Sequence, residues 1–191
     1  DFDSQAWEIE AWAGRDINKL LFRTEGETED NETEEFETQL LWNRAVARFW
    51  DLQLGWRRDW GLVAERDWFA AGLTGLAPGF IDLEITGFVG EEGTVSVRVK
   101  AAYEIVLTQK LKLEPKIELS WFSDEDPVNG IGRGISSTEA GLRLAYAVRR
   151  NFKPYIGVHW EHLSGSTARF ASAEGESDSE LAAVLGLKWS F

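Results

Sequence analysis

The chain has 191 residues, enough for one domain with a sizeable interior, and its 33 acidic residues outnumber its 20 basic residues to give a formal charge of −13. This charge argues against a nucleic-acid partner, because binding to a phosphate backbone needs a basic face. The absence of cysteine excludes a disulfide framework and a thiolate metal site. No apolar run approaches the roughly 18 residues of a spanning helix, so a membrane span would have to be a tilted strand of about 9–11 residues.

Apolar and polar residues alternate with a period of two along most of the chain, which is typical of β-strands. In TVSVRVKAAYEIVL (94–107), for example, Val97 and Val99 share one face, and Arg98 and Lys100 share the other. No capped segment shows a sustained helical period, so no helix is predicted. We predict eleven strands in chain order, at residues 6–13, 18–27, 34–46, 51–60, 67–76, 80–90, 94–107, 110–122, 138–149, 154–164 and 180–191.

The predicted connections alternate between short and long. The short ones contain residues 14–18, 47–51, 77–79, 108–110 and 149–153, and the long ones are 28–33, 61–66, 90–94, 123–137 and 164–179. Short turns at one rim and long polar loops at the other are typical of an up-and-down transmembrane barrel. A soluble meander barrel shares this pattern, so the direction of the apolar face must decide between the two.

Two features favour an apolar face that points outward, into lipid. The polar face carries charges of both signs deep in the strands, such as Arg23 with Glu25 and Arg57 with Asp59, which suits a polar lumen. Tryptophans stand mostly toward strand ends on the apolar face, where aromatic girdles form at membrane interfaces. These tryptophans are Trp7, Trp42, Trp56, Trp68, Trp121, Trp160 and Trp189.

The last segment, LAAVLGLKWSF (181–191), is a third feature. Its alternating apolar residues end on a phenylalanine, and this pattern resembles the signal by which the barrel-assembly machinery recognises outer-membrane proteins of Gram-negative bacteria. We therefore predict that Leu185, Leu187, Trp189 and Phe191 face outer-membrane lipid, with Phe191 at the periplasmic rim. The long loops are then extracellular and the short turns periplasmic.

Eleven strands would place the N-terminus outside the cell, whereas bacterial single-chain barrels have an even number of strands. The opening DFDSQ reads as the tail of a long loop that precedes Trp7. We therefore predict an all-β fold, an antiparallel up-and-down transmembrane β-barrel of 12 strands in the intact protein. Residues 1–191 would form a single barrel domain that lacks the first strand.

Several segments resemble the copper resistance protein B (CopB) family of bacterial outer-membrane proteins, in the same order and spacing. They include FWDLQLGWRRD (49–59), GLAPGFIDLEITGFVGEEG (75–93) and YEIVLTQKLKLEPKIEL (103–119), together with residues 6–27 and 130–161. The resemblance implies a barrel that helps a bacterium to tolerate copper, with periplasmic copper-handling proteins as partners. The family usually carries a Met- and His-rich segment before the barrel, and we expect that segment to be absent here because the chain has no methionine.

The two histidines lie in HWEH (159–162). On a strand, His159 and Glu161 share the lumen face, and His162 lies on the opposite face or above the rim. Imidazole is a copper ligand, so His159 and Glu161 are the candidate contacts for a weakly or transiently bound copper ion. The alternative is a structural histidine that is hydrogen-bonded to a neighbouring acid.

The remaining lumen charges are expected to form a structural network that closes the bore; the alternative is that the acids attract cations. The acids are Glu8, Glu10, Glu25, Glu35, Glu37, Asp82, Glu84, Glu104, Glu114, Glu118 and Glu139. The bases are Arg23, Arg57, Arg98, Lys100, Lys112, Lys116, Arg143 and Lys188.

No catalytic constellation is predicted. Ser164 and Ser166 lie near His162 in sequence, but no orienting acid completes a triad. The sequence therefore predicts a non-enzymatic outer-membrane barrel in copper resistance, which binds, sequesters or exports copper. A porin or channel of other specificity and a purely structural membrane anchor are the alternatives.

Overall fold

The computed structural model describes residues 4–29, 32–61, 65–149 and 151–189, which form a twelve-stranded antiparallel sheet. The strands are β1 (Ser4–Arg15), β2 (Asn18–Glu29), β3 (Glu32–Ala47), β4 (Trp50–Trp60), β5 (Arg66–Ala77), β6 (Ile81–Gly90), β7 (Val95–Ala102), β8 (Ile105–Val106), β9 (Leu111–Phe122), β10 (Gly134–Tyr146), β11 (Phe152–Leu163) and β12 (Ser179–Trp189). Each long strand pairs with the next, and the two-residue β8 pairs only with β9. The eleven predicted strands are confirmed. The segment predicted as 94–107 is divided between β7 and β8.

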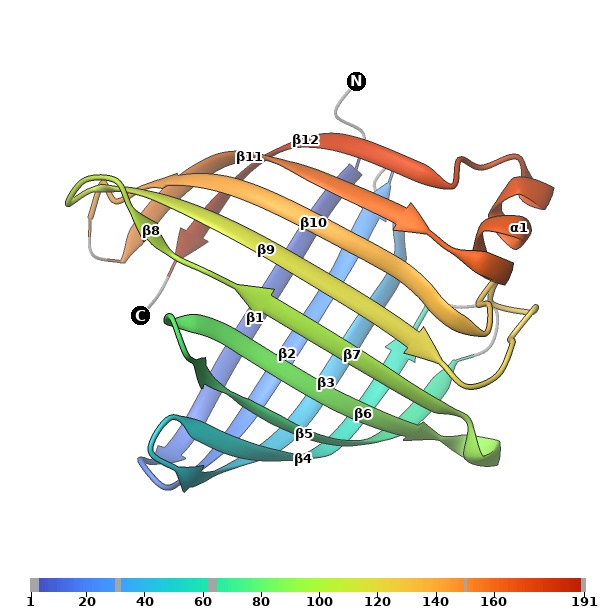
Figure 1. Ribbon diagram of the computed structural model, residues 1–191, viewed down its shortest axis with the longest axis horizontal. Helices are drawn as coiled ribbons and strands as arrows, with labels where there is room; N and C mark the ends of the chain where they lie inside the picture. The colour runs from blue at the N-terminus through green and yellow to red at the C-terminus, as the bar shows by residue number, and fades with distance from the viewer. Residues whose placement is uncertain (1–3, 30–31, 62–64, 150, 190–191) are drawn as a thin grey trace.

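The sheet curls around an interior, so that β1–β3 lie behind β6–β9 in Figure 1. Every long strand crosses the molecule at a tilt, which is the geometry that a closed barrel needs. Within the described residues, no backbone pairing joins β1 to β12. The additional strand predicted to complete the barrel remains a prediction.

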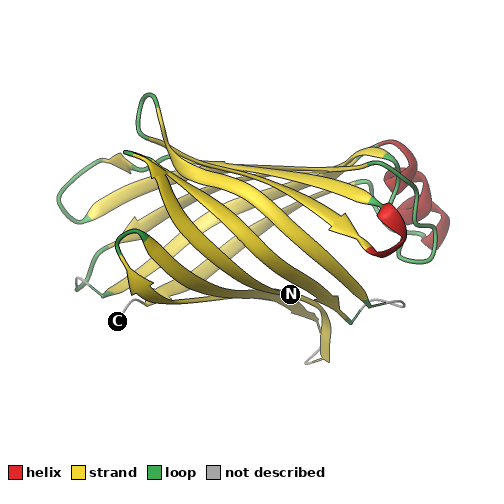
Figure 2. Cartoon of the chain, turned by 90° about the horizontal axis from the view of Figure 1, so that it is seen from below, coloured by secondary structure: helices red, strands yellow, loops and turns green. Residues whose placement is uncertain are grey.

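The connections sort to the two rims as predicted. Figure 2 shows tight turns at one end of the strands, and the helix and longer loops at the other. The long-loop rim carries η1 (Glu91–Gly93) and α1 (Gly165–Glu174). Neither helical segment in the described part of the chain has the length and apolarity that a membrane-crossing helix requires.

The prediction of a loop throughout 164–179 is wrong, because residues 165–174 form α1. The helix is held by contacts with the loop before β10. Thr167 Oγ1 accepts a hydrogen bond from the Gly132 N–H at 2.8 Å, and Ser166 Oγ donates to Glu125 at 2.5 Å. Gly175 ends the helix with a φ of 90°, and its N–H donates to the Ser172 carbonyl. The small, mixed residues of α1 carry little apolar periodicity, so these tertiary contacts decide its structure.

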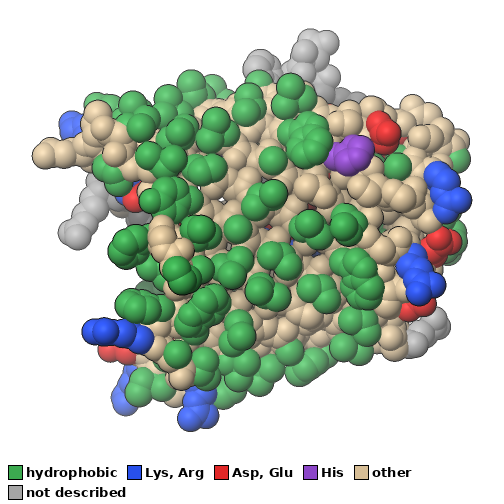
Figure 3. Space-filling view, viewed as in Figure 1, with side chains coloured by type: hydrophobic (Ala, Val, Ile, Leu, Met, Phe, Trp, Pro, Cys, Tyr) green, Lys and Arg blue, Asp and Glu red, His purple; other side chains and the backbone are tan. Residues whose placement is uncertain are grey.

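The apolar face of the sheet points outward, as predicted. Leu40, Ile85 and Leu142 are each more than 40 % exposed, whereas Gln39 and Gln53 on the inner face are 1–2 % exposed. In Figure 3, hydrophobic side chains cover the visible wall and charged side chains gather toward its ends. This is the reverse of a soluble barrel and is the arrangement of a transmembrane one.

The predicted outward tryptophans are confirmed at four positions that are 37–39 % exposed, namely Trp42, Trp56, Trp121 and Trp160. Trp7 also lies on the outer face. Its partner is Gly26, and the adjacent pair of Glu8 with Glu25 points inward, so the alternation along β1 turns Trp7 outward. In β12, Leu185 and Leu187 are 79 % and 63 % exposed. The side chain of Trp189 and the whole of Phe191 lie outside the described residues.

The prediction for Trp68 is wrong, because this side chain points into the barrel and is 2 % exposed. Its Nε1 donates a hydrogen bond to Asp59 at 2.9 Å. Both faces of β5 are apolar, so alternation does not settle the direction of its side chains. Trp68 instead belongs to an interior cluster together with Leu21, Leu41, Ala70, Phe88 and Phe122, against which Ile131 packs.

Candidate functional site in the barrel lumen

Ion pairs cross the lumen between strands that are not neighbours. Arg98 on β7 donates to both carboxylate oxygens of Glu37 on β3, at 3.0 and 2.8 Å. Its Nε lies 3.3 Å from Glu118 on β9. The side chains of Arg98 and Glu37 are only 14 % and 11 % exposed. The pair of Arg98 with Glu37 therefore ties opposite walls of the barrel together, whereas the contact with Glu118 joins the adjacent strands β7 and β9.

Glu37 is shared by a second guanidinium. Arg57 lies 2.8 Å from Glu37 and 2.6 Å from Asp59, and Gln39 also donates to Glu37. The Arg57 guanidinium lies 4.8 Å from the centre of the Phe88 ring, within reach of a cation–π interaction. The buried charges are thus held by several partners each, which a buried ion pair needs to offset its desolvation.

A further group of pairs lies nearer the short-turn rim. Arg23 contacts Glu84 at 3.1 Å and Glu10 at 3.2 Å. Lys100 lies 3.2 Å from Glu25 and 3.4 Å from Glu118. The predicted pairing of lumen acids with lumen bases is confirmed for the following residues, which we call the lumen ion-pair network: Glu10, Arg23, Glu25, Glu37, Arg57, Asp59, Glu84, Arg98, Lys100, Lys116 and Glu118.

Other predicted lumen charges lie outside this network. Glu104 lies between β7 and β8, and the register on either side of it, Ala102 with Lys116 and Val106 with Lys112, keeps it on the same inner face as Lys112, as predicted. There its carboxylate, which is 43 % exposed, accepts hydrogen bonds from the Lys112 ammonium at 2.7 Å. The side chain of Glu35 lies outside the described residues.

The inner wall of β9–β12 carries a row of directly opposed glutamates. Glu118 pairs with Glu139, Glu139 with Glu161, and Glu161 with Glu180 across successive strands. Like charges directly opposite one another disfavour the sheet unless a cation compensates them. Within this row, Glu118 is compensated by the lumen ion-pair network.

The structure brings His159 to this row of glutamates. Its Nε2 lies 3.8 Å from the Glu139 carboxylate, and the two side chains are 35 % and 30 % exposed. Glu161 shares the inner face with His159, two residues along β11, and is the direct partner of Glu139. His162 is on the outer face, where its ring stacks on Trp160 at 5.8 Å. The sequence predicts the inner face of His159 correctly, but its pairing with Glu139 depends on the register of β10 and β11.

The donors on this wall suit Cu(II) better than Cu(I), because they are imidazole and carboxylate without a thioether. Within the described residues, no three His, Cys, Asp or Glu side chains are placed closely enough to hold a metal ion. His159 and Glu139 could therefore supply only part of a coordination sphere, and water would have to complete it.

A cavity of about 400 Å³ occupies the half of the lumen nearer the short turns. Its lining combines acids and bases from opposite walls. The charged residues are Glu8, Arg23, Asp82, Glu84, Lys100, Glu114, Lys116, Arg143 and Lys188. Water and small solutes have room in this half of the lumen, whereas Trp68 and Phe88 and the ion pairs of Glu37 with Arg57 and Arg98 are buried.

Comparison with solved structures supports the fold. The chain is similar to a NanC porin structure with a TM-score of 0.67, which covers 99 % of this chain and 94 % of the porin at 12 % sequence identity. Identity at this level supports the architecture alone.

Comparison of sequences identifies the relatives. The chain is 42 % identical over 183 residues to copper resistance protein B of Escherichia coli, covering 96 % of this chain and 62 % of that protein. It is 40 % identical over 191 residues to a copper resistance protein B homolog of Pseudomonas syringae pv. tomato, covering 100 % of this chain and 65 % of that protein. The chain thus spans less than two thirds of the length of these relatives. Residues 1–191 match the copper resistance protein B precursor (CopB) family, and the chain therefore belongs to that family.

Proposed function

We propose that this chain is a barrel of the outer membrane of a Gram-negative bacterium, which takes part in copper resistance by binding copper ions weakly in its lumen. The names of the two relatives support the link to copper resistance. The apolar outer face and the polar lumen support a location in a membrane. Recognition by the barrel-assembly machinery would use the outward stripe that includes Leu185 and Leu187.

The observation that carries the copper proposal is the position of His159 beside Glu139 on the glutamate row. A Cu(II) ion accepts imidazole and carboxylate ligands, and the neighbouring Glu161 and Glu180 add negative potential that favours a cation. Because the site has one imidazole and no thioether, we expect its affinity for copper to be low. Such a site would hold copper transiently and pass it to or from periplasmic copper-handling proteins.

The contacts of the candidate nucleophiles support a non-enzymatic role. Ser166 Oγ donates a hydrogen bond to Glu125 and accepts one from Arg169, both at 2.5 Å, so neither contact is the histidine base of a Ser–His pair. His162 is stacked on Trp160 on the outer face.

A structural membrane anchor is the second candidate. The ion pairs from Arg98 to Glu37 and from Arg23 to Glu84 cross the interior and oppose a wide diffusion pore. An anchor would need the barrel to be filled and stable but would not need His159.

Calorimetric titration with Cu(II) separates the two candidates. The protein in detergent micelles should bind Cu(II) weakly, and His159→Ala should weaken the affinity at least tenfold because the only inward imidazole is lost. His162→Ala is the matched control, since it removes the outward histidine, and it should leave the affinity unchanged. Equal binding by all three proteins, or none by any, would favour the anchor.

A further inference from the structure

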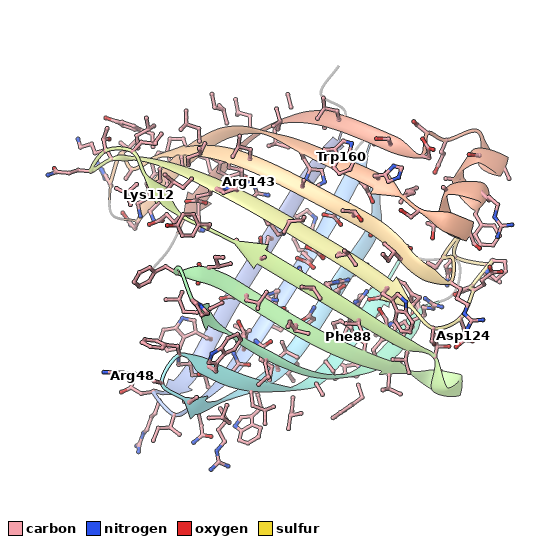
Figure 4. All side chains as sticks on the ribbon, viewed as in Figure 1. Arg48, Phe88, Lys112, Asp124, Arg143 and Trp160 are labelled. Atoms are coloured by element: carbon pink, nitrogen blue, oxygen red, sulfur yellow. The ribbon has the colours of Figure 1, made fainter. Side chains whose placement is uncertain are left out.

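The charge on the inner wall of β9–β12 reverses between the two rims. Toward the long-loop rim this wall carries the glutamate row. Toward the short-turn rim, the described residues that face inward from this wall include five bases and a single acid, Glu114. The bases are Lys112, Lys116, Arg143, Lys153 and Lys188. Figure 4 shows Lys112 and Arg143 on the same side of the molecule, away from Asp124 at the opposite rim. This concentration of positive charge is unexpected in a chain with a net charge of −13.

Two of these bases face each other directly. Lys153 on β11 and Lys188 on β12 are register partners, so their side chains leave the same face of adjacent strands. Their β-carbons are then about 5 Å apart, and like charges at this separation disfavour the pairing of the strands. A bound anion between the two ammonium groups would convert this repulsion into attraction.

An aromatic residue lies beside the lysine pair. Tyr155 follows Lys153 by two residues on the same face, and the Arg143 guanidinium lies 5.0 Å from the centre of its ring. The Tyr155 ring extends over Gly186, where a β-carbon would come within 2.4 Å of its hydroxyl oxygen. The glycine therefore permits this ring position, and the stacking fixes the direction of the guanidinium.

The acids near these bases are largely committed to other partners. Glu84 pairs with Arg23, Glu118 with Lys100 and Lys116, and Glu104 with Lys112. Glu114 stands opposite Arg143 in the register, and Glu8 and Asp82 belong to other walls of the cavity. Arg143 and Lys188 both line the cavity of about 400 Å³, so a small solute has room to reach them.

We propose that Arg143, Lys153, Lys188 and the Tyr155 hydroxyl form a binding site for a small free anion with two or more carboxylate or phosphate groups. Guanidinium and ammonium groups donate charge-assisted hydrogen bonds to such oxygens. The site faces the lumen, so the ligand is a dissolved anion and not the headgroup of a lipid. This site is separate from His159 and does not depend on the copper proposal.

The experiment measures urea unfolding of the protein in uncharged detergent micelles, with citrate or inorganic phosphate replacing chloride at constant ionic strength. Both anions should raise the unfolding midpoint of the wild type. In Lys153→Gln/Lys188→Gln the rise should be lost, and in chloride this variant should be at least as stable as the wild type because the repulsion is removed. The control, Arg48→Gln/Lys110→Gln, removes the same charge from turns of the same rim and should keep the full response.

An equal response of all three proteins would show a general effect of the anions and overturn the proposal, as would the absence of any response in the wild type. Micelles doped with phosphatidylglycerol test the lipid as the source of the oxyanion. Stabilisation by that lipid without stabilisation by citrate would also contradict a site for a free anion.

Discussion

Arg98→Ala is expected to destabilise the folded barrel by about 3–5 kcal/mol, the range measured when one partner of a buried ion pair is removed. Arg98 compensates Glu37 and Glu118, and both carboxylates are almost fully enclosed. Its loss leaves negative charge in a poorly hydrated part of the lumen. The guanidinium also lies 5.6 Å from the centre of the Phe88 ring, and this contact is lost too.

Reversible urea unfolding from lipid vesicles, followed by tryptophan fluorescence, measures this change. Arg48→Ala is the control, because Arg48 is exposed in the turn after β3. Like Arg98, it lies near an aromatic ring, with its guanidinium 5.7 Å from the centre of the Phe49 ring. Its replacement should change the free energy of unfolding by less than about 1 kcal/mol. Similar values for the two variants would show that the lumen ion-pair network does not stabilise the barrel.

The second large effect is expected on the outer face. Val99 lies opposite Ile85 and Leu119, in the middle of the apolar wall. Val99→Arg should cost about 2–4 kcal/mol, because a charged side chain near the bilayer midplane must leave water or deform the lipid.

The matched control places the same substitution at the rim. Val148 is 49 % exposed beyond the end of β10, and Val148→Arg should cost no more than about 1 kcal/mol because water is within reach. The same unfolding measurement compares the two variants. A cost near zero for Val99→Arg would contradict the assignment of this face to lipid.

The sequence predicts the strands and the direction of most side chains, because alternation with a period of two is a local property. Val97, Val99 and Arg98 take the faces that the alternation assigns. Alternation is uninformative where both faces are apolar, and there the prediction for Trp68 is wrong. The hydrogen bond from Trp68 to Asp59 joins two strands and has no local signature.

The candidate site is less predictable, because its contacts depend on strand register and barrel curvature. The pair of Arg98 with Glu37 joins residues 61 positions apart and exists only because β3 and β7 face each other across the interior. The approach of His159 to Glu139 depends on which residue of β10 stands beside it. The helix α1 is likewise decided by its contacts with the loop around Gly132.

The central claim, that the lumen contacts copper through His159, is tested most directly by electron paramagnetic resonance of Cu(II) bound to the protein in detergent micelles. With protein in excess over copper, the spectrum of the wild type should show coupling to the nitrogen of one imidazole. His159→Ala should abolish this coupling, and His162→Ala should preserve it. Nitrogen coupling that persists in His159→Ala and disappears in His162→Ala would place copper on the outer face and contradict the proposed site.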